Sequence, residues 1–344
     1  MKPIIFCLLI LIFWLCQDTV AQKSEYIHIE PANFKIAHSI FSEVEVTDTR
    51  FDTVYMGFVQ KGAFNRKAPI KLTQSMTDEV RESALKLVAN AGKGDETILI
   101  NIPNYFLSEL TGAMSESGTF IFKAGCYLKR GYSYQFMFAV DTTIMEHALD
   151  VTKKLLRTAN EQFGLFIQKA ALFDKDKLDD KPGYSFYEIQ HIDETEKRFI
   201  PVYNVELPQK GLYASFENFK NNTPIETKFI KEFNKKTKEP SFFRVKGDGN
   251  KGNEIPRNAL YAVCDGDQLY ISTEYGIYPV TKRDNDFYFT GKAKETANTA
   301  AVAMASLMFG ILGGMLASIP EKATFEFKID HVSGKFLPVK KVSN

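Results

Sequence analysis

The side chains that could bind a metal or transfer a proton are thinly spread along this chain. Its histidines are His28, His38, His147, His191 and His331. None of them forms the His-x-x-x-His or His-Glu-x-x-His spacing that places two imidazoles on one helix face to hold zinc. The Gly-x-Ser-x-Gly elbow of serine hydrolases is also absent from the sequence. We therefore predict no catalytic residues, no metal ligands and no cofactor.

Two groups of acidic residues invite a functional interpretation. His191 is followed by Asp193, Glu194 and Glu196, which suggests an acid/base cluster, but such closely spaced charges fit an exposed loop better. A second group of aspartates lies within residues 172–182. A calcium-binding loop that starts there needs Gly at its sixth position and Glu at its twelfth, where this chain has Asp179 and Ser185. We predict a solvated, charged linker.

The first 21 residues have the pattern of a secretory signal peptide. Lys2 precedes an apolar run over residues 4–15, and the segment closes on Thr19-Val20-Ala21. The apolar run is shorter than the roughly 20 residues that a spanning helix requires. We expect an exported protein of the periplasm or the outer-membrane periphery of a Gram-negative bacterium. Lipidation at Cys16 is an alternative, although the bulky Trp14 and Leu15 disfavour it.

Removal of this leader would leave two cysteines, Cys126 and Cys264. Both lie in apolar, strand-like stretches, which favours buried free thiols. Export would also permit a disulfide between them, and this alternative remains open.

Composition places the chain among ordinary globular proteins. The 344 residues carry 43 basic and 42 acidic side chains, a net charge of +1. This balance argues against nucleic acid as a partner and against electrostatic capture by an anionic membrane. The length suits two domains, for which we expect residues 22–171 and 184–344, joined by a linker over residues 172–183.

The first of these domains has the pattern of an α/β sandwich. Strand-like stretches at residues 41–46, 97–102, 118–128 and 132–141 alternate with two amphipathic segments. The first predicted helix begins at Thr77, and Thr143 with Glu146 forms a capping box for the second. We expect a mixed sheet with both helices on one face.

Residues 44–50, Val-Glu-Val-Thr-Asp-Thr-Arg, are followed by Gly57 before the first predicted helix. This motif resembles the envelope α/β domains of transport-auxiliary and curli-secretion lipoproteins, over about residues 39–171. The resemblance implies a periplasmic scaffold or assembly subunit.

The second domain is predicted to be rich in strands, so the whole chain belongs to the α+β class. Its expected strands are residues 202–207, 211–214, 242–245, 260–264, 268–273, 278–281 and 287–290. Asp265-Gly266-Asp267 should form a hairpin turn, and residues 246–254 a surface loop. Ser215 should cap a short helix that buries Phe216 and Phe219.

Residues 210–219, Lys-Gly-Leu-Tyr-Ala-Ser-Phe-Glu-Asn-Phe, are followed by Asn222 and Pro224, and Tyr-Ala-Val-Cys-Asp-Gly-Asp stands at residues 261–267. These two blocks resemble a secreted, uncharacterised family of Bacteroidetes-type bacteria, over about residues 202–280. The resemblance implies export and carries no activity.

An uncharged, Ala/Gly-rich run at residues 297–319 is the most unusual segment. Ser306, Gly310, Gly314 and Ser318 recur every fourth residue, a spacing that lets two helices approach closely. We predict a helical insertion, since residues 287–290 and 323–331 before and after it should pair in one sheet. It would pack on the protein, rest on a membrane surface or contact another subunit; a true span is the remaining alternative.

Together these patterns favour a non-catalytic exported protein of the cell envelope that acts in protein–protein or membrane-surface association. Its interaction residues would be Ser306, Gly310, Gly314 and Ser318, and its partners an envelope protein or its own subunits. The alternatives are a secreted hydrolase with a dispersed active site and a subunit of an oligomeric envelope assembly.

Overall fold

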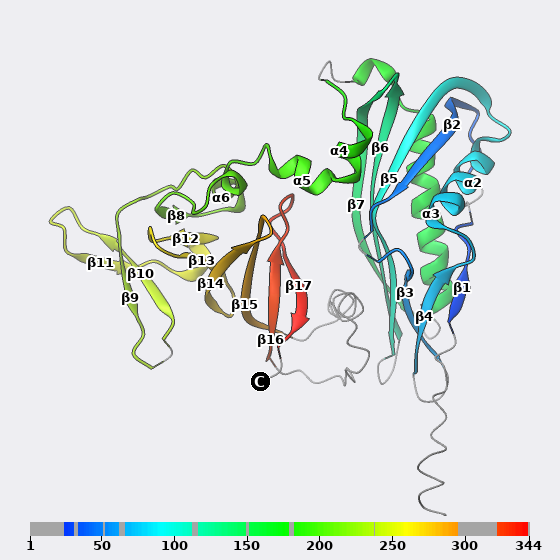
Figure 1. Cartoon of the computed structure of the whole chain (residues 1–344). Helices are drawn as coiled ribbons and strands as arrows, with labels where there is room; N and C mark the ends of the chain where they lie inside the picture. The colour runs from blue at the N-terminus through cyan, green and yellow to red at the C-terminus, as the bar shows by residue number, and fades with distance from the viewer. Residues whose placement is uncertain are drawn as a thin grey trace, which may run out of the picture.

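Two large β-sheets and one small sheet hold most of the described chain (Figure 1). The computed structural model describes residues 24–30, 34–50, 52–61, 66–111, 116–148, 151–178, 182–236, 238–294 and 322–342. The predicted α+β class is confirmed, because helices cover only part of a structure dominated by strands.

The N-terminal sheet is mixed, as predicted. Its order is β1-β4-β3-β5-β6-β7, with β2 pairing with β5. The β2–β5, β3–β5 and β1–β4 pairs are parallel, whereas β5–β6 and β6–β7 are long antiparallel ladders. Its strands are β1 (Glu25–Ile27), β2 (His38–Asp48), β3 (Gly57–Lys61), β4 (Arg66–Leu72), β5 (Gly92–Thr111), β6 (Glu116–Arg130) and β7 (Ser133–Ala148).

Helix α2 (Met76–Val88) packs on this sheet through residues spaced by four. Met76, Val80, Ala84 and Val88 are all buried, as an amphipathic stripe requires. The predicted N-cap was wrong by two residues. The N-cap is Ser75, whose side-chain oxygen accepts a hydrogen bond from the backbone N–H of Asp78. Thr77 therefore lies in the first turn of the helix.

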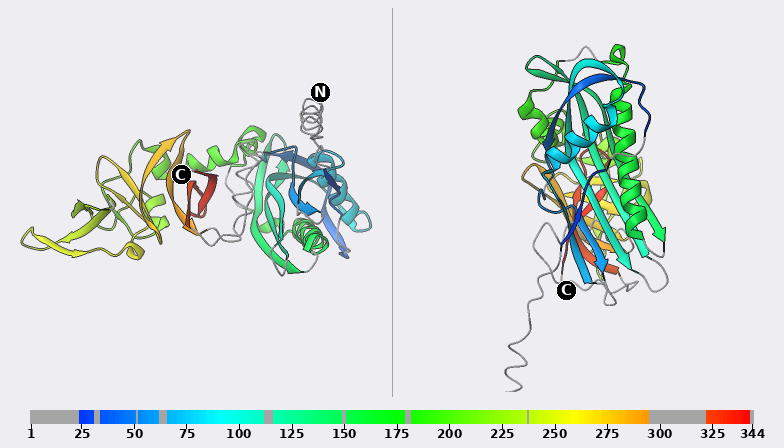
Figure 2. Two further views of the ribbon diagram at one scale, coloured as in Figure 1. Left: turned by 90° about the horizontal axis from the view of Figure 1, so that it is seen from below. Right: turned by 90° about the vertical axis from the view of Figure 1, so that its right-hand side faces the viewer.

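Helix α3 (Val151–Ala171) begins later than predicted. The predicted capping box of Thr143 and Glu146 is wrong, because both residues lie within β7. Glu146 instead accepts a hydrogen bond from Thr158 of α3 at 2.8 Å, so it ties the strand to the helix. Both α2 and α3 lie on the sheet face turned away from the C-terminal sheet (Figures 1 and 2), which agrees with the prediction that the helices share one face.

The motif at residues 48–57 forms a rigid corner at the end of β2. The buried Arg50 guanidinium donates two hydrogen bonds to the Asp48 carboxylate, from Nε and from Nη2, each at 2.8 Å. It also donates to the backbone carbonyls of Thr53 and Tyr55, both at 3.3 Å. The chain then enters β3 at Gly57, whose φ of +124° suits glycine alone.

We expect Gly57→Ala to destabilise the fold strongly. An added Cβ would lie 1.7 Å from the Leu107 carbonyl oxygen, so β3 and β5 would have to separate. Gly131 is a matched control, since its φ of +61° is also positive but nothing lies within 4 Å of its Cβ position. Chemical denaturation should give a loss of about 3 kcal/mol or more for Gly57→Ala and about 1 kcal/mol for Gly131→Ala. Equal losses would contradict the close β3–β5 approach.

Short helices connect the N-terminal sheet to the rest of the chain. They are η1 (Lys175–Lys177), α4 (Phe186–Gln190), α5 (Ile192–Lys197) and η2 (Pro201–Asn204). Two predictions fail here: the exposed loop around Asp193 is helix α5, and residues 202–207 hold part of a 3-10 turn and bends in place of a strand. Ile189 of α4 is fully buried against Leu99, Tyr127 and Tyr134, on the face opposite α2 and α3.

The C-terminal sheet is an antiparallel meander in the order β17-β16-β15-β14-β13-β12-β8. Its strands are β8 (Gly211–Tyr213), β12 (Ala262–Cys264), β13 (Leu269–Thr273), β14 (Gly276–Arg283), β15 (Asp286–Lys294), β16 (Lys322–Ile329) and β17 (Phe336–Lys341). The predicted pairing of the strands on either side of the apolar run is confirmed, since β15 pairs with β16 from Tyr288↔Lys328 to Lys294↔Lys322.

The turn and the helix cap that were predicted in the C-terminal part are both confirmed. Gly266 has a φ of +105° between β12 and β13, and Ser215 caps helix α6 (Phe216–Lys220). Phe219 is fully buried and Phe216 packs against the same cluster. A 3-10 turn, η3 (Arg257–Ala259), precedes β12.

A three-stranded sheet projects from the C-terminal sheet (Figure 1) and contains β9 (Phe229–Phe233), β10 (Pro240–Val245) and β11 (Lys251–Glu254). The predicted surface loop over residues 246–254 is therefore partly a strand, because its polar residues need only pair their backbone with β10. Lys231 of β9 forms an ion pair with Asp265 in the β12–β13 turn and so ties the two sheets together.

Asp265 should contribute a stability that depends on pH. Burial on its own would raise the pKa of this carboxyl, but Lys231 and the backbone N–H groups of Asp267 and Gln268 outweigh burial and lower it. A pKa below the unfolded value of about 3.9 stabilises the fold above that pH and loses this contribution as the pH falls through the folded pKa. We expect Asp265→Asn to cost about 1–3 kcal/mol at pH 7. Urea unfolding at pH 7 and pH 3 should show this cost shrinking at pH 3; a constant cost would contradict the assignment.

Candidate functional site

The interaction residues predicted from sequence, Ser306, Gly310, Gly314 and Ser318, lie outside the described residues, as do the leader at residues 1–21 and the rest of the run at residues 297–319. Among the helices that the structure describes, none combines the length and apolar character needed to cross a bilayer. Two other features of the described chain could act on a partner or a ligand: the outer edge of β7 and a partly buried polar cluster around His331.

The outer edge of β7 is long and open. Within the described residues, β7 pairs with β6 along its whole length, and on its other side with a single residue, Tyr184. The Tyr134 and Tyr184 backbones exchange two hydrogen bonds of 2.8 Å. The N–H and C=O groups of Tyr134 therefore point toward Tyr184 and away from β6.

Along β7, the backbone N–H and C=O groups of successive residues point alternately toward β6 and away from it. A bulge opposite Cys126 and Tyr127 shifts the register by one residue, so the outward-pointing backbone groups change from even to odd positions. The outward residues after the bulge are then Ala139, Asp141, Thr143, Met145 and His147. The same five side chains are exposed, whereas those between them are half-buried.

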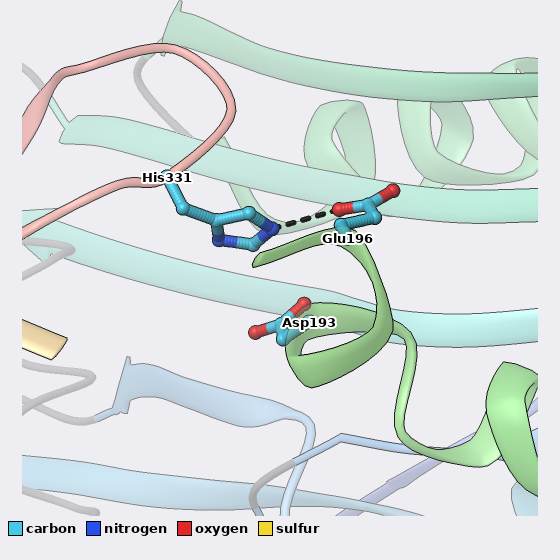
Figure 3. Close-up of side chains that lie close together, drawn as sticks. All are labelled: Asp193, Glu196 and His331. Carbon is cyan, nitrogen blue, oxygen red and sulfur yellow. Dashed lines mark hydrogen bonds and ion pairs between the residues drawn. The ribbon is translucent and has the colours of Figure 1, made fainter. Parts of the chain in front are cut away.

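Asp193, Glu196 and His331 converge although His331 is distant in sequence (Figure 3). The two carboxylates lie three residues apart on α5, and His331 lies in the turn between β16 and β17. One ligand atom from each residue lies within 4.8 Å of the other two. His331 is only 2% exposed, and its Nε2 lies 2.7 Å from Glu196 Oε2.

Tyr203 of η2 lies beside this cluster. Its ring meets the His331 ring edge-on with centroids 6.3 Å apart, and its buried hydroxyl has no hydrogen-bond partner in the described structure. Burial first, and then the charges of Asp286, Asp330 and Asp193, raise the pKa of Tyr203 well above its usual value. The hydroxyl therefore stays neutral and can donate a hydrogen bond.

An ion triad of the buried Lys197 and Asp286 and the half-buried Lys328 lies next to the same cluster. Asp286 Oδ1 lies 2.7 Å from Lys197 Nζ, and Asp286 Oδ2 lies 2.8 Å from Lys328 Nζ. Lys197 follows Glu196 on α5 and is 3% exposed. Burial alone would lower the pKa of Lys328, but the Asp286 carboxylate outweighs it and raises that pKa. The triad thus joins α5 to β15 and β16.

The His331 cluster also faces the N-terminal sheet. Burial alone would raise the pKa of the Asp330 carboxyl, but hydrogen bonds from Ser333 and then the charge of Lys123 of β6 lower it. Tyr127 of β6 has its pKa raised first by burial and then by the charge of Glu196. The cluster therefore lies where α5, the β16–β17 turn and β6 come together.

The two cysteines take no part in either feature. Cys126 and Cys264 are free and fully buried, which confirms the expected buried thiols. The Cys126 thiol lies 3.6 Å from Met137 Sδ, and the Cys264 thiol donates to the Pro208 carbonyl at 3.1 Å. Burial raises the pKa of both thiols, so neither is a ready nucleophile.

Two of the three residues of the His331 cluster, Asp193 and Glu196, follow His191 in the sequence, where the pattern predicts an exposed loop. His191 does not belong to the cluster, and its ring stacks on Tyr187 at 4.2 Å. The histidine that joins them is 135 residues from Glu196 in sequence. The Asp-x-x-Glu spacing on a helix was the one local signal available, and no local pattern pointed to His331.

The ion triad predicts a large stability effect for Asp286→Asn. This change leaves the buried Lys197 and the half-buried Lys328 without their shared counter-charge, and we expect a loss of about 3 kcal/mol in urea unfolding. Glu232→Gln is the control, because its pair with Lys251 is exposed and should contribute no more than about 0.5 kcal/mol. A loss below about 1 kcal/mol for Asp286→Asn would show that the triad does not hold α5 in place.

One family model matches part of the chain. A family of unknown function (DUF6563) matches residues 211–343, so an uncharacterised family covers much of the C-terminal part. No curated protein matches the sequence. Among solved structures, the crystal structure of protein XCC0632 from Xanthomonas campestris, assigned to DUF330, is similar with a TM-score of 0.26 and 9% identity. The similarity covers 42% of this chain and 90% of that one.

Proposed function

We propose that this protein is a non-catalytic association protein of the cell envelope, and that it binds an extended segment of a partner protein along the outer edge of β7. Export rests on the leader pattern at residues 1–21. The mode of binding is strand addition, in which a peptide joins an existing sheet through main-chain hydrogen bonds. The single observation that carries the proposal is the open edge of β7 beyond Tyr134.

The composition of this edge supports strand addition. Natural sheets usually block a free edge with lysine, proline, a bulge or a very short strand. The ten residues after the bulge, 139–148, contain neither lysine nor proline. They continue as regular strand to Ala148 and remain paired with β6 throughout. Such an edge presents unpaired N–H and C=O groups in register for an incoming strand.

A single bridge at the start of this edge supports the proposal. Tyr184 bridges Tyr134 in the antiparallel sense. Two residues earlier, Pro182 has no N–H to donate, so it cannot extend the ladder along β7. The remaining edge is thus left to another polypeptide, for which we infer an extended, unblocked segment.

The side chains beside the edge would give the interaction its specificity. On one face, Asp141, Met145 and His147 alternate as exposed acidic, apolar and basic groups. On the other face, Glu146 is held by Thr158 and by an ion pair with Lys154 of α3. A partner strand would therefore place alternate side chains against a mixed surface and against the α3 side.

We expect Thr143→Pro to abolish partner binding. Proline removes an N–H that points away from β6, so the β6–β7 ladder keeps its hydrogen bonds while the edge loses a central donor. Thr143→Val is the matched control, because it keeps the N–H. A photo-cross-linking residue at position 141, in cells that produce the protein, should give a discrete adduct with Thr143→Val and none with Thr143→Pro.

Two results would contradict the proposal. One is an adduct that survives Thr143→Pro unchanged while both variants retain the far-ultraviolet spectrum and unfolding midpoint of the parent. The other is an adduct formed only with a second copy of this chain, which would instead assign β7 to self-association.

A further inference from the structure

We propose that Asp193, Glu196 and His331 form a binding site for one first-row divalent cation, for which zinc is the expected ion. The site is independent of the β7 edge. It would join helix α5 to the β16–β17 turn and thereby fix the connection between the two large sheets.

The donor set and its spacing match this class of ion. Asp193 and Glu196 are separated by one helical turn and so lie on one face of α5. Their oxygens and an imidazole nitrogen of His331 lie within 4.8 Å of one another, a spread that three ligands around a single cation can adopt after small side-chain rotations. Imidazole combined with carboxylate suits zinc and its neighbours, whereas calcium and magnesium prefer oxygen ligands alone.

The charges of the cluster are incompletely balanced without a cation. Glu196 has His331 as a partner, but the described residues give the half-buried Asp193 carboxylate no hydrogen bond or ion pair. Lys197 and Lys328 both form their ion pairs with Asp286, and Asp193 acts on Lys328 only through its charge. Two carboxylates at this separation repel each other, and a divalent cation between them would remove that repulsion.

Tyr203 supplies an independent observation. A buried hydroxyl without a partner is uncommon, because desolvation of an unpaired donor costs about 1–3 kcal/mol. Tyr203 is only 2% exposed, its hydroxyl is unpaired in the described structure, and its ring meets the ring of the ligand His331 edge-on. A water molecule that completes the coordination of the cation would give the Tyr203 hydroxyl an acceptor.

The ligands belong to segments that other contacts already bring together. Lys197 anchors the end of α5 to β15, and Tyr203 packs against both Phe287 and His331. The backbone of the site is therefore preorganised, and binding needs only side-chain adjustment. A cation placed there would restrain α5 and residues 330–335 together.

The test is zinc titration of the metal-stripped chain, residues 22–344, by isothermal calorimetry. We expect one zinc ion per chain, and affinity at least about tenfold weaker in Asp193→Asn. Glu194→Gln is the matched control on the same helix and should bind as the parent does. His191→Ala should also bind normally, which excludes that exposed histidine as the ligand.

A second measurement separates a ligand from a merely structural residue. In EDTA, Asp193→Asn should unfold at the same temperature as the parent or slightly higher, because it removes a like-charge contact. Added zinc should raise the unfolding temperature of the parent and Glu194→Gln only. It should also slow amide exchange in α5 and residues 330–335. Equal zinc binding by Asp193→Asn and Glu194→Gln would indicate an adventitious ion only and would overturn the proposal. The absence of zinc binding by the parent would overturn it as well.

Discussion

The need to pair backbone hydrogen-bonding groups is the constraint on which the N-terminal half of this structure depends. The long ladders β5–β6 and β6–β7 pair most of the backbone N–H and C=O groups of these strands with one another. Helices α2 and α3 cover the apolar side chains of one face. That arrangement leaves a long row of groups along the outer edge of β7 without a partner beyond Tyr134 in the described residues, as it also does along the outer edge of β2, which pairs only with β5. Water can satisfy these groups, but so can a strand, and a strand would in addition bury the neighbouring side chains.

A second constraint acts where the sheets meet. Helix α5 carries the buried Lys197 together with Asp193 and Glu196, which are partly exposed. Lys197 finds Asp286, and Glu196 finds His331. These contacts all reach the C-terminal sheet, whereas α4 buries Ile189 against the N-terminal sheet. The two short helices α4 and α5 thus connect the N-terminal sheet to the C-terminal sheet. An ion bound to α5 would stabilise that connection.

Sequence reasoning succeeded where the determining interactions are local. The cap at Ser215, the turn at Gly266 and the apolar stripe of α2 depend on residues a few positions apart, and each was predicted correctly in type. It failed where a longer ladder outcompeted a local signal. Thr143 and Glu146 have the spacing of a capping box, but continued pairing with β6 keeps them in β7. The His331 cluster could not be predicted, because the β16–β17 turn meets α5 only through the tertiary fold.

The open edge of β7 is the central claim, and amide hydrogen exchange of the isolated complex tests it most directly. In the chain alone, the N–H groups of Ala139, Asp141, Thr143, Met145 and His147 should exchange faster than those of the intervening residues, which pair with β6. When the cross-linked partner is present, these five amides should become as slow as their neighbours. If they remain fast in the complex while protection appears on other elements, the partner does not add a strand to β7 and the account is wrong.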